Sequence, residues 1–314
     1  MAFEQKRTPV AIHVGLPKTG TTSMQELCFE QHPDIRYFGQ SNLWENKDAK
    51  QILATLLVEE QYINNIAETR KLVFKLKEQG KAIVISDEAI TFGEFMLRAN
   101  TWDIISDHFT IAKRAHEIFG DVHIFIVLRN QADWLQSWQR QGLKTAKYVE
   151  TDFEKWLEND IGVKKKHLFE LLDYNALYNA YVNVFGKENV HVRFYEDYVS
   201  KYEDLAVDFV SILGVDPERT RGLISSNKRN VSGRSFRGLP KLIQKIIRND
   251  TVKPLLKVMP RRLRKSLRSI LEVEKRYASL TDSQHASIMR YFSESNAALF
   301  RQIGIADKKL NYIQ

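Results

Sequence analysis

Short apolar runs alternate along the chain with longer segments of helical periodicity. The runs "PVAIHVG", "KAIVISDEAI", "DVHIFIVLRN" and "NVHVRFYED" have the length and composition of buried strands. Segments with apolar residues three or four positions apart follow them, such as "TTSMQELCFEQH" and "QADWLQSWQRQGLK". Strands that alternate with helices indicate βαβ units, so we expect an α/β fold with three layers, in which helices flank a central, mainly parallel sheet.

Further helical segments occupy much of the remaining sequence. The segment at 49–79, "AKQILATLLVEEQYINNIAETRKLVFKLKEQ", predicts a helix that is broken once and ends before Gly80. Three more helices are predicted from "WDIISDHFTIAKRAHEIFG", "LFELLDYNALYNAYVNVFG" and "YEDLAVDFVSILG". The strand–helix rhythm ends near Ser225, and basic helical segments follow. With 314 residues and no internal repeat, we expect a single domain over 1–314 with a helical C-terminal region.

Three polar clusters follow predicted strands. They are Lys18 to Thr22, Ser86 to Glu88, and the segment that begins at Arg129. In open parallel sheets, ligands bind beyond the carboxyl ends of the strands. We therefore expect these clusters to meet at one edge of the sheet and to form the functional site.

The first cluster has the composition of a phosphate-binding loop. "HVGLPKTGTT" joins a predicted strand to a predicted helix, and its glycines permit tight turns and close approach of a ligand to the backbone. In the ATP-binding loop GxxxxGK[ST], the lysine follows the second glycine. Here Thr21 follows Gly20, and Lys18 precedes that glycine by two positions. Further hydrogen-bond donors come from the hydroxyls of Thr19, Thr21, Thr22 and Ser23.

Two motifs carry a family resemblance. "GLPKTGTTSMQ" resembles the 5′-phosphosulfate loop of sulfotransferases that use 3′-phosphoadenosine 5′-phosphosulfate (PAPS), and "VLRNQADWLQSWQRQG" resembles their 3′-phosphate motif. The resemblance implies a P-loop-like fold and PAPS as donor, with no metal required. It assigns 5′-phosphosulfate binding to Pro17, Lys18, Thr19, Gly20, Thr21, Thr22 and Ser23. It assigns 3′-phosphate binding to Arg129 and Ser137, and the forked guanidinium of arginine suits a phosphate.

The candidates for a catalytic base lie near two of these strands. In carbohydrate-acting members of the resembled family, an acidic residue at the end of the second predicted strand often serves as the base, which here matches Glu88, with Asp87 as the alternative. A carboxylate within hydrogen-bond reach of an acceptor hydroxyl can remove its proton. Glu88 can equally cap the next segment or pair with a basic loop. His13 is a further candidate base, although a histidine in an apolar strand is more often a core residue.

Other parts of the chain resemble the same family. "SSNKRNVSGRSFRG" falls where the family has a loop over the cofactor, which places Arg229 and Asn230 among the candidate cofactor-binding residues, with a solvated basic loop as the alternative. "NVHVRFYEDYVSKYEDLAVDFVSILGV" matches a family segment with a structural role. "MRYFSESNAALFRQIG" resembles the C-terminal helix of bacterial members that act on glycans. The implied acceptor is a carbohydrate or glycolipid.

Charge is concentrated in one segment. The chain has a net charge of +8, but residues 234–268 hold 12 Lys or Arg and one acid, whereas the remainder has a net charge of −3. The segment 234–277 predicts basic amphipathic helices, which can contact an anionic membrane or cover an acidic substrate. Helices that pack on the core with a solvated basic face are the alternative.

Composition narrows the remaining choices. Cys28 is the single cysteine, so no internal disulfide or thiolate-rich metal site is possible. No signal peptide and no apolar segment long enough to span a membrane is recognised. We therefore expect a cytoplasmic protein, and the alternative is a protein that contacts the inner face of the membrane peripherally. Two other function classes stay open: a P-loop kinase, which the position of Lys18 argues against, and a basic nucleic-acid-binding module, which no DNA or RNA motif supports.

Overall fold

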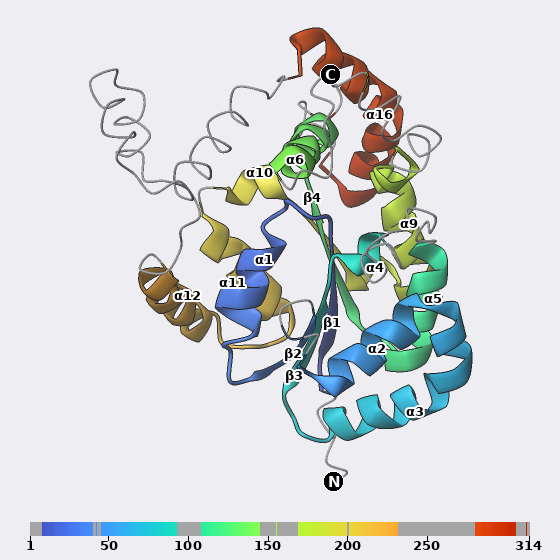
Figure 1. Cartoon of the computed structure of the whole chain (residues 1–314), viewed down its shortest axis with the longest axis vertical. Coiled ribbons are helices and arrows are strands. Elements are labelled where there is room, and N and C mark those ends of the chain that lie inside the picture. The colour runs from blue at the N-terminus through green and yellow to red at the C-terminus, as the bar shows by residue number, and fades with distance from the viewer. Residues whose placement is uncertain are drawn as a thin grey trace, which may run out of the picture.

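The protein is built around a five-stranded sheet. The computed structural model describes residues 8–39, 42, 45–92, 108–144, 155, 169–199, 201–231, 280–305 and 312. All strand pairs of the sheet are parallel, in the order β2-β3-β1-β4-β5 (Figure 1). The strands are β1 (Val10–Gly15), β2 (Ile35–Gly39), β3 (Ala82–Ser86), β4 (His123–Leu128) and β5 (Val190–Phe194). The parallel α/β sheet predicted from the sequence is confirmed.

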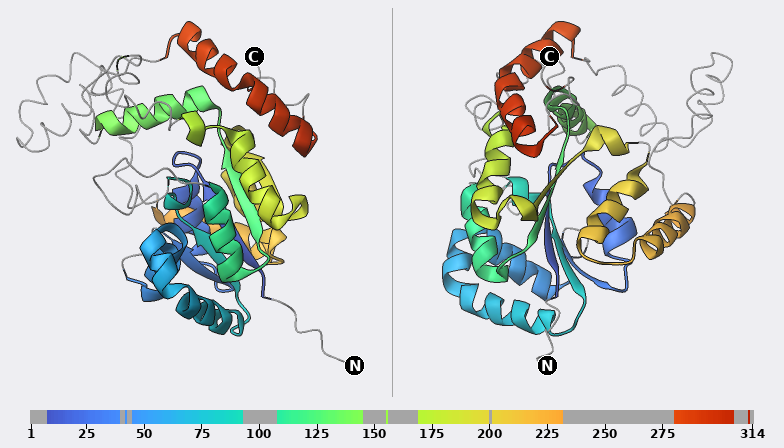
Figure 2. Two further views of the ribbon diagram at one scale, coloured as in Figure 1. Left: turned by 90° about the vertical axis from the view of Figure 1, so that its right-hand side faces the viewer. Right: turned by 180° about the vertical axis from the view of Figure 1, so that it is seen from behind.

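Helices cover both faces of this sheet, which gives the three predicted layers (Figures 1 and 2). One face carries α1 (Thr21–Met24), its continuation η1 (Gln25–Phe29), α11 (Tyr202–Ile212) and α12 (Pro217–Val231). The other face carries α2 (Lys47–Leu57), α3 (Glu59–Lys77), α5 (His108–Phe119) and α9 (Tyr174–Phe185). The break between α2 and α3 falls at Val58, as the single interruption in the 49–79 pattern predicted.

The alternation of side chains along β1 explains why two cores form. Val10, Ile12 and Val14 belong to the core on the α2, α5 and α9 side. Ala11 lies in the second core, which includes Phe29 and other residues of η1 and α11. Because successive side chains of a strand point to opposite faces, an almost fully apolar β1 requires helices on both sides.

A further group of helices stands beyond the carboxyl ends of the strands. This group consists of α6 (Gln131–Lys144), α10 (Tyr195–Tyr198) and α16 (Asp282–Ile303). In Figure 1 these helices occupy the upper end of the molecule, and α16 packs against both α6 and α9. A capping box between Thr281 and Gln284 begins α16, and Gly304 ends it with a φ of 74°. The helical C-terminal region is therefore present as predicted.

Several local predictions were wrong. β2 was missed because Arg36 interrupts the apolar pattern of "IRYFG", which an edge strand of the sheet allows. The predicted second strand ends at Ser86, so Asp87 and Glu88 follow it and precede the short helix α4 (Ala89–Phe92). The chain does not become a loop near Ser225, because α12 continues to Val231. The basic segment 234–277 lies outside the described residues.

Within the described part of the chain, no helix combines the length and the apolar content needed to cross a bilayer.

Candidate functional site

The loop between β1 and α1 lies at the carboxyl edge of the sheet. Its strand, β1, is flanked by β3 and β4, so the three predicted polar clusters follow three adjacent strands. Lys18 has a φ of 72° and Gly20 a φ of 84°, both in the left-handed region. For Lys18 that conformation costs on the order of 1 kcal/mol, and such strain in a non-glycine residue often accompanies a functional site.

Four consecutive carbonyl oxygens of this loop accept hydrogen bonds from side chains. The donors are Thr91 Oγ1 to Gly15 O (3.2 Å), Thr19 Oγ1 to Leu16 O (2.6 Å), Trp134 Nε1 to Pro17 O (2.7 Å) and Arg129 Nη1 to Lys18 O (2.8 Å). A turn with left-handed residues whose carbonyls are held in this way can present its N–H groups to one concave side. This arrangement is typical of an anion-binding loop.

The helix that follows adds to the positive character of the loop. Gly20 O accepts the first helical hydrogen bonds, from Ser23 N at 3.1 Å and Met24 N at 3.3 Å. The amides of the first helical turn have no partner within the helix, and the helix dipole favours an anion beside them. Thr22 and Ser23 are half-buried in this turn. The hydroxyl of Thr19, which we expected to face a ligand, instead donates within the loop.

Gly15 is required by the close approach of its neighbours. A Cβ atom at this position would lie 2.7 Å from Thr21 Cγ2 and 2.9 Å from His13 Nε2. The end of β1 therefore packs directly under the first residue of α1, and a larger residue would displace the loop.

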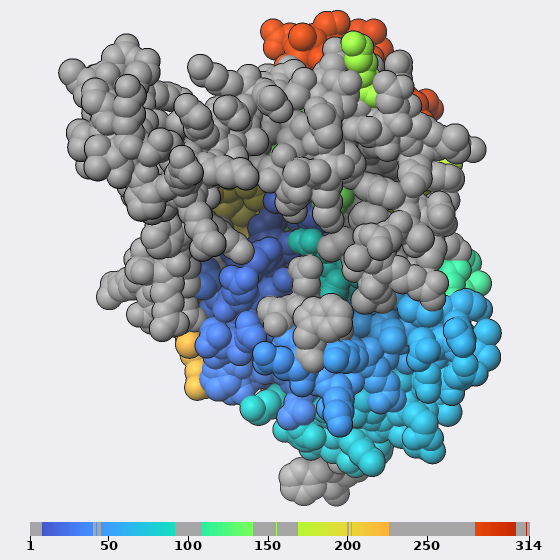
Figure 3. Space-filling view, viewed as in Figure 1, coloured from blue at the N-terminus to red at the C-terminus, as the bar shows by residue number. Residues whose placement is uncertain are grey.

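Glu88 lies against this loop. Its Oε1 accepts a hydrogen bond from Thr21 Oγ1 at 2.8 Å. Burial raises the pKa of Glu88 above its ordinary value, while the bond from Thr21 and the charge of Lys18 act in the opposite direction. In the space-filling view, a small teal patch from the region of α4 is visible beside the blue of the N-terminal segment (Figure 3). The second polar cluster thus meets the first, as predicted.

Asp87 has a different environment from its neighbour. Its side chain is 4% exposed, and its Oδ1 accepts a hydrogen bond from Ala89 N at 2.8 Å, at the start of α4. Burial raises the pKa of Asp87 to about 6. Asp87 therefore shapes the turn after β3, whereas Glu88 contacts the loop.

His13 lies in the core on the α1 and α11 side. Its side chain is 1% exposed, and its ring makes edge contacts with Phe29, Phe125 and Phe209. His13 Nδ1 lies 2.8 Å from Ser86 Oγ, and burial lowers the pKa of His13 to about 3. These surroundings favour the core alternative over the role of a base that faces the acceptor.

Arg129 is held between the loop and α10. Besides its bond to Lys18 O, its guanidinium lies 4.8 Å from the centre of the Tyr195 ring, in a cation–π contact. Ser137 is half-buried in the second turn of α6, the helix that begins two residues after Arg129. The hydrogen bond from Arg129 to Lys18 O joins the third polar cluster to the first.

Several residues of this site were not singled out from the sequence. Thr91 and Trp134 hold loop carbonyls, and Tyr195 supports Arg129. Tyr195 belongs to the YED stretch whose resemblance we assigned to structure, and Trp134 begins an i, i+4 tryptophan pair that stacks at 5.4 Å. Arg229 and Asn230 stand near the end of α12 rather than in a loop, and their side chains lie outside the described set.

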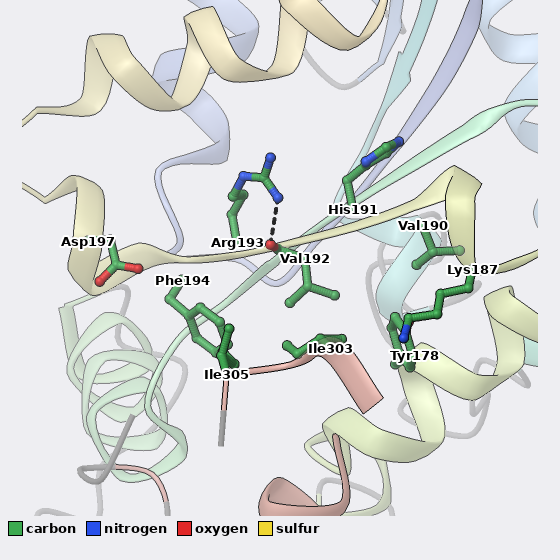
Figure 4. A pocket seen from close by; sticks show the side chains of 10 residues that line it. All are labelled: Tyr178, Lys187, Val190, His191, Val192, Arg193, Phe194, Asp197, Ile303 and Ile305. Carbon is green, nitrogen blue, oxygen red and sulfur yellow. Dashed lines mark hydrogen bonds between the residues drawn. The ribbon is translucent and has the colours of Figure 1, made fainter. Parts of the chain in front are cut away.

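A separate hollow lies beside the edge strand β5. It has a volume of about 570 Å³, and its lining includes Tyr178, Lys187, Ile303 and Ile305 along with residues of β5 (Figure 4). None of the predicted site residues lines it. Among the described residues, no three His, Cys, Asp or Glu side chains gather where they could hold a metal ion.

Comparison with known proteins supports the fold. No family model matches the chain, and no curated protein matches it. Among solved structures, a sulfotransferase from Alicyclobacillus acidocaldarius matches with a TM-score of 0.54 and 16% sequence identity, over 94% of this chain and 96% of that one. This chain therefore has the fold of that sulfotransferase. At such low sequence identity the match supports the fold alone. Any assignment of chemistry has to rest on the residues of the candidate site.

Proposed function

We propose that this protein is a PAPS-dependent sulfotransferase, which transfers a sulfuryl group to a hydroxyl of an acceptor by in-line displacement. The observation that carries the proposal is the loop from Gly15 to Lys18. All four of its carbonyls are bonded to side chains, and one of these donors is Arg129. The shared fold with a solved sulfotransferase supports the same conclusion.

The residues of the site suit a ligand with two anionic groups. The loop amides, the first turn of α1 and Lys18 would hold the 5′-phosphosulfate, with Thr22 and Ser23 beside them. Arg129 and Ser137 would hold the 3′-phosphate. The bond from Arg129 to Lys18 O supports this division, because it places the guanidinium directly beside the loop.

The side chains also suit the chemistry of transfer. PAPS would supply a sulfuryl group activated by its bond to phosphate. Lys18 would provide a positive charge that stabilises the negative charge developing on the departing phosphate. Glu88 would accept the proton of the acceptor hydroxyl. The burial that raises its pKa makes it a stronger base than an exposed glutamate.

The chemical class of the acceptor is a more specific proposal than the reaction itself. We propose a carbohydrate or glycolipid acceptor, on the resemblance of the C-terminal helix and the base position to carbohydrate-acting relatives. The basic segment 234–277 would contact the acidic acceptor or an anionic membrane, and Arg229 and Asn230 would contribute to the cofactor site from the end of α12. A cytoplasmic location fits the use of PAPS.

Calorimetry with 3′-phosphoadenosine 5′-phosphate (PAP), the reaction product, tests this function. The wild-type protein should bind PAP in the presence of a chelator and prefer it to ATP with Mg²⁺. Arg129→Ala should weaken PAP binding by about tenfold to a hundredfold, because it removes a charge-assisted phosphate contact. Arg70→Ala, which changes an exposed arginine of α3, is the matched control and should bind PAP normally. A preference for ATP with Mg²⁺ would instead indicate a P-loop kinase.

A further inference from the structure

The peptide group between Arg129 and Asn130 is bonded at both of its polar atoms by side chains. Tyr174 Oη donates to Arg129 O at 2.6 Å, and Asn130 N donates to Glu196 Oε1 at 2.8 Å. Peptide groups at the end of a strand are ordinarily satisfied by the sheet, the next helix or water. Here two other helices, α9 and α10, hold the orientation of the backbone from which the Arg129 side chain extends.

Glu196 connects this peptide group to the C-terminal end of the chain. While its Oε1 accepts the bond from Asn130 N, its Oε2 accepts a bond from Tyr312 Oη at 2.7 Å. Glu196 also follows Tyr195, whose ring lies under the Arg129 guanidinium. A rotation of the Glu196 carboxylate would therefore disturb the peptide group from which the Arg129 side chain extends.

Tyr312 is itself fixed on several sides. It is fully buried, and its ring makes edge contacts with Phe194 at 5.4 Å and Phe300 at 5.7 Å. Its backbone carbonyl accepts a hydrogen bond from Asn296 Nδ2 at 2.8 Å. Burial, together with the neighbouring Glu196, raises the pKa of Tyr312 well above its ordinary value, so the hydroxyl keeps the proton that it donates.

A reciprocal amide pair ties the same region to the start of α6. Gln131 Nε2 donates to Asn296 Oδ1 at 2.8 Å, and Asn296 Nδ2 donates to Gln131 Oε1 at 3.2 Å. Both residues are fully buried, where such bonds are stronger than in water. Residues 129 to 131 are thus connected to α16 and Tyr312 by two independent routes, one through Glu196 and one through Asn296.

We propose that Tyr312 is a positioning residue for Arg129, and that the C-terminal end of the chain thereby sets the affinity of the second anion position. This inference rests on the proposed function, because it takes the ligand of Arg129 to be the 3′-phosphate of the donor. Tyr312 acts through Glu196 and does not contact the ligand.

The test compares two nucleotides that differ only in the 3′-phosphate. In Tyr312→Phe the ring stays and the hydroxyl bond to Glu196 is lost. The ratio of the dissociation constants for adenosine 5′-monophosphate and PAP measures what the 3′-phosphate adds to binding. We expect this ratio to fall about fivefold to tenfold in Tyr312→Phe, within the net worth of one ordinary hydrogen bond, with little change in the affinity for adenosine 5′-monophosphate. Glu196→Gln, a second variant, should lower the ratio in the same direction.

Tyr181→Phe is a matched control. Tyr181 is equally buried on α9, and its hydroxyl makes no hydrogen bond in the described part of the chain, so the same atom is removed without a bond. The nucleotide ratio of this control should equal that of the wild type.

The possible failures are distinguishable. If the wild type binds both nucleotides equally, the proposed function fails and the inference fails with it. If the wild type prefers PAP and Tyr312→Phe keeps the full preference, the positioning role alone is overturned. Equal weakening of both nucleotides in Tyr312→Phe would also overturn it, because that result indicates a general loss of structure.

Discussion

At the scale of single residues, two adjacent carboxylates have different surroundings. Glu88 accepts a hydrogen bond from Thr21 at the start of α1, directly after the loop, whereas Asp87 is nearly inaccessible and accepts a bond from the backbone of Ala89. Burial raises the pKa of both side chains, but the charge of Lys18 favours ionisation of Glu88, and the charge of Glu88 opposes ionisation of Asp87. Glu88 is therefore the better candidate for the base.

Replacement of Glu88 tests this assignment. Glu88→Gln keeps an oxygen that can accept the bond from Thr21 but cannot take a proton, so turnover should fall by about 10²-fold to 10⁴-fold with PAP affinity nearly unchanged. Sulfate transfer from PAPS and calorimetry with PAP measure the two effects. Asp87→Asn is the matched control, and loss of turnover in that variant alone would move the role of the base to Asp87.

The activity of the wild type should also depend on pH through Glu88. A base must be deprotonated, and burial raises the pKa of Glu88 above the ordinary 4.5. The rate should therefore decline with falling pH at a higher pH than an exposed glutamate would produce. In Glu88→Gln the residual rate should lack this decline.

His13 makes stability depend on pH in a defined direction. Its folded-state pKa is about 3, against an ordinary value of 6.5, so the unfolded state binds the proton more readily. The contribution of His13 to stability is complete above pH 6.5 and declines as pH falls toward 3, by about 1.4 kcal/mol for each pH unit. His13→Phe should lack this decline.

Urea unfolding of both proteins between pH 7 and pH 4 measures the difference in free energy. Asp87 has a raised pKa and acts in the opposite direction, but it is common to both proteins and cancels in the comparison. Parallel stability curves for wild type and His13→Phe would contradict the assignment of a neutral, buried His13.

Several residues of the candidate site could be predicted from sequence because their chemistry is local. Lys18 and Gly20 stand in a contiguous motif, and Arg129 follows an apolar strand, so type and spacing sufficed to single them out. Thr91 and Trp134 could not be predicted, because they donate to carbonyls 76 and 117 positions away in the sequence. Nothing in a linear pattern marks such pairs.

At the scale of elements, α6 begins two residues after Arg129 and also contacts the loop between β1 and α1. Asn130 Oδ1 accepts bonds from Ala132 N at 3.1 Å and Asp133 N at 3.2 Å, which begins the helix. One turn later, Trp134 donates to Pro17 O. The start of α6 thereby sets the position of the loop relative to Arg129.

Replacement of Trp134 tests the contribution of this contact. Trp134→Phe keeps an aromatic ring in the core but removes the indole N–H, which leaves Pro17 O without this donor. We expect PAP affinity to fall about fivefold, with a modest loss of stability from the smaller ring. Calorimetry and thermal unfolding measure the two effects. Reduced stability with unchanged PAP affinity would show that the bond does not shape the loop.

Secondary structure followed the sequence wherever periodicity was long and strong. β1, β3, β4, α2, α3, α5 and α6 agree with the predicted segments, whereas β2 was missed because Arg36 interrupts its apolar pattern at the sheet edge. α12 was not predicted, because its second half, "SSNKRNV", has loop-like composition. The backbone there continues the helix despite that composition, because local propensity only weakly determines whether a segment is helical.

At the scale of the whole molecule, the strand order explains how the site is assembled. The chain passes from β1 to β2 at one edge, returns through β3, and then crosses to β4 on the other side of β1. Ligands of open α/β sheets bind at such a switch point, where the connections diverge. The loop after β1, Glu88 after β3 and Arg129 after β4 meet there for this topological reason.

The C-terminal part of the chain completes this end of the molecule. Helix α16 packs on α6 and α9, and Tyr312 extends the contacts to Glu196, which accepts the bond from Asn130 N beside Arg129. The single domain over 1–314 and the partner of the basic segment 234–277 stay predictions, with the basic segment outside the described residues.

The sequence by itself determined the α/β class, the loop with its displaced lysine, and the candidate residues after three strands. These are properties of hydrophobic period and local motif, which short-range sterics and burial dictate. Only the tertiary structure decided that His13 belongs to the core, that Glu88 rather than Asp87 meets the loop, and that Tyr312 reaches the residues beside Arg129. Those outcomes depend on which distant side chains the sheet order brings together, and a linear pattern does not record that order.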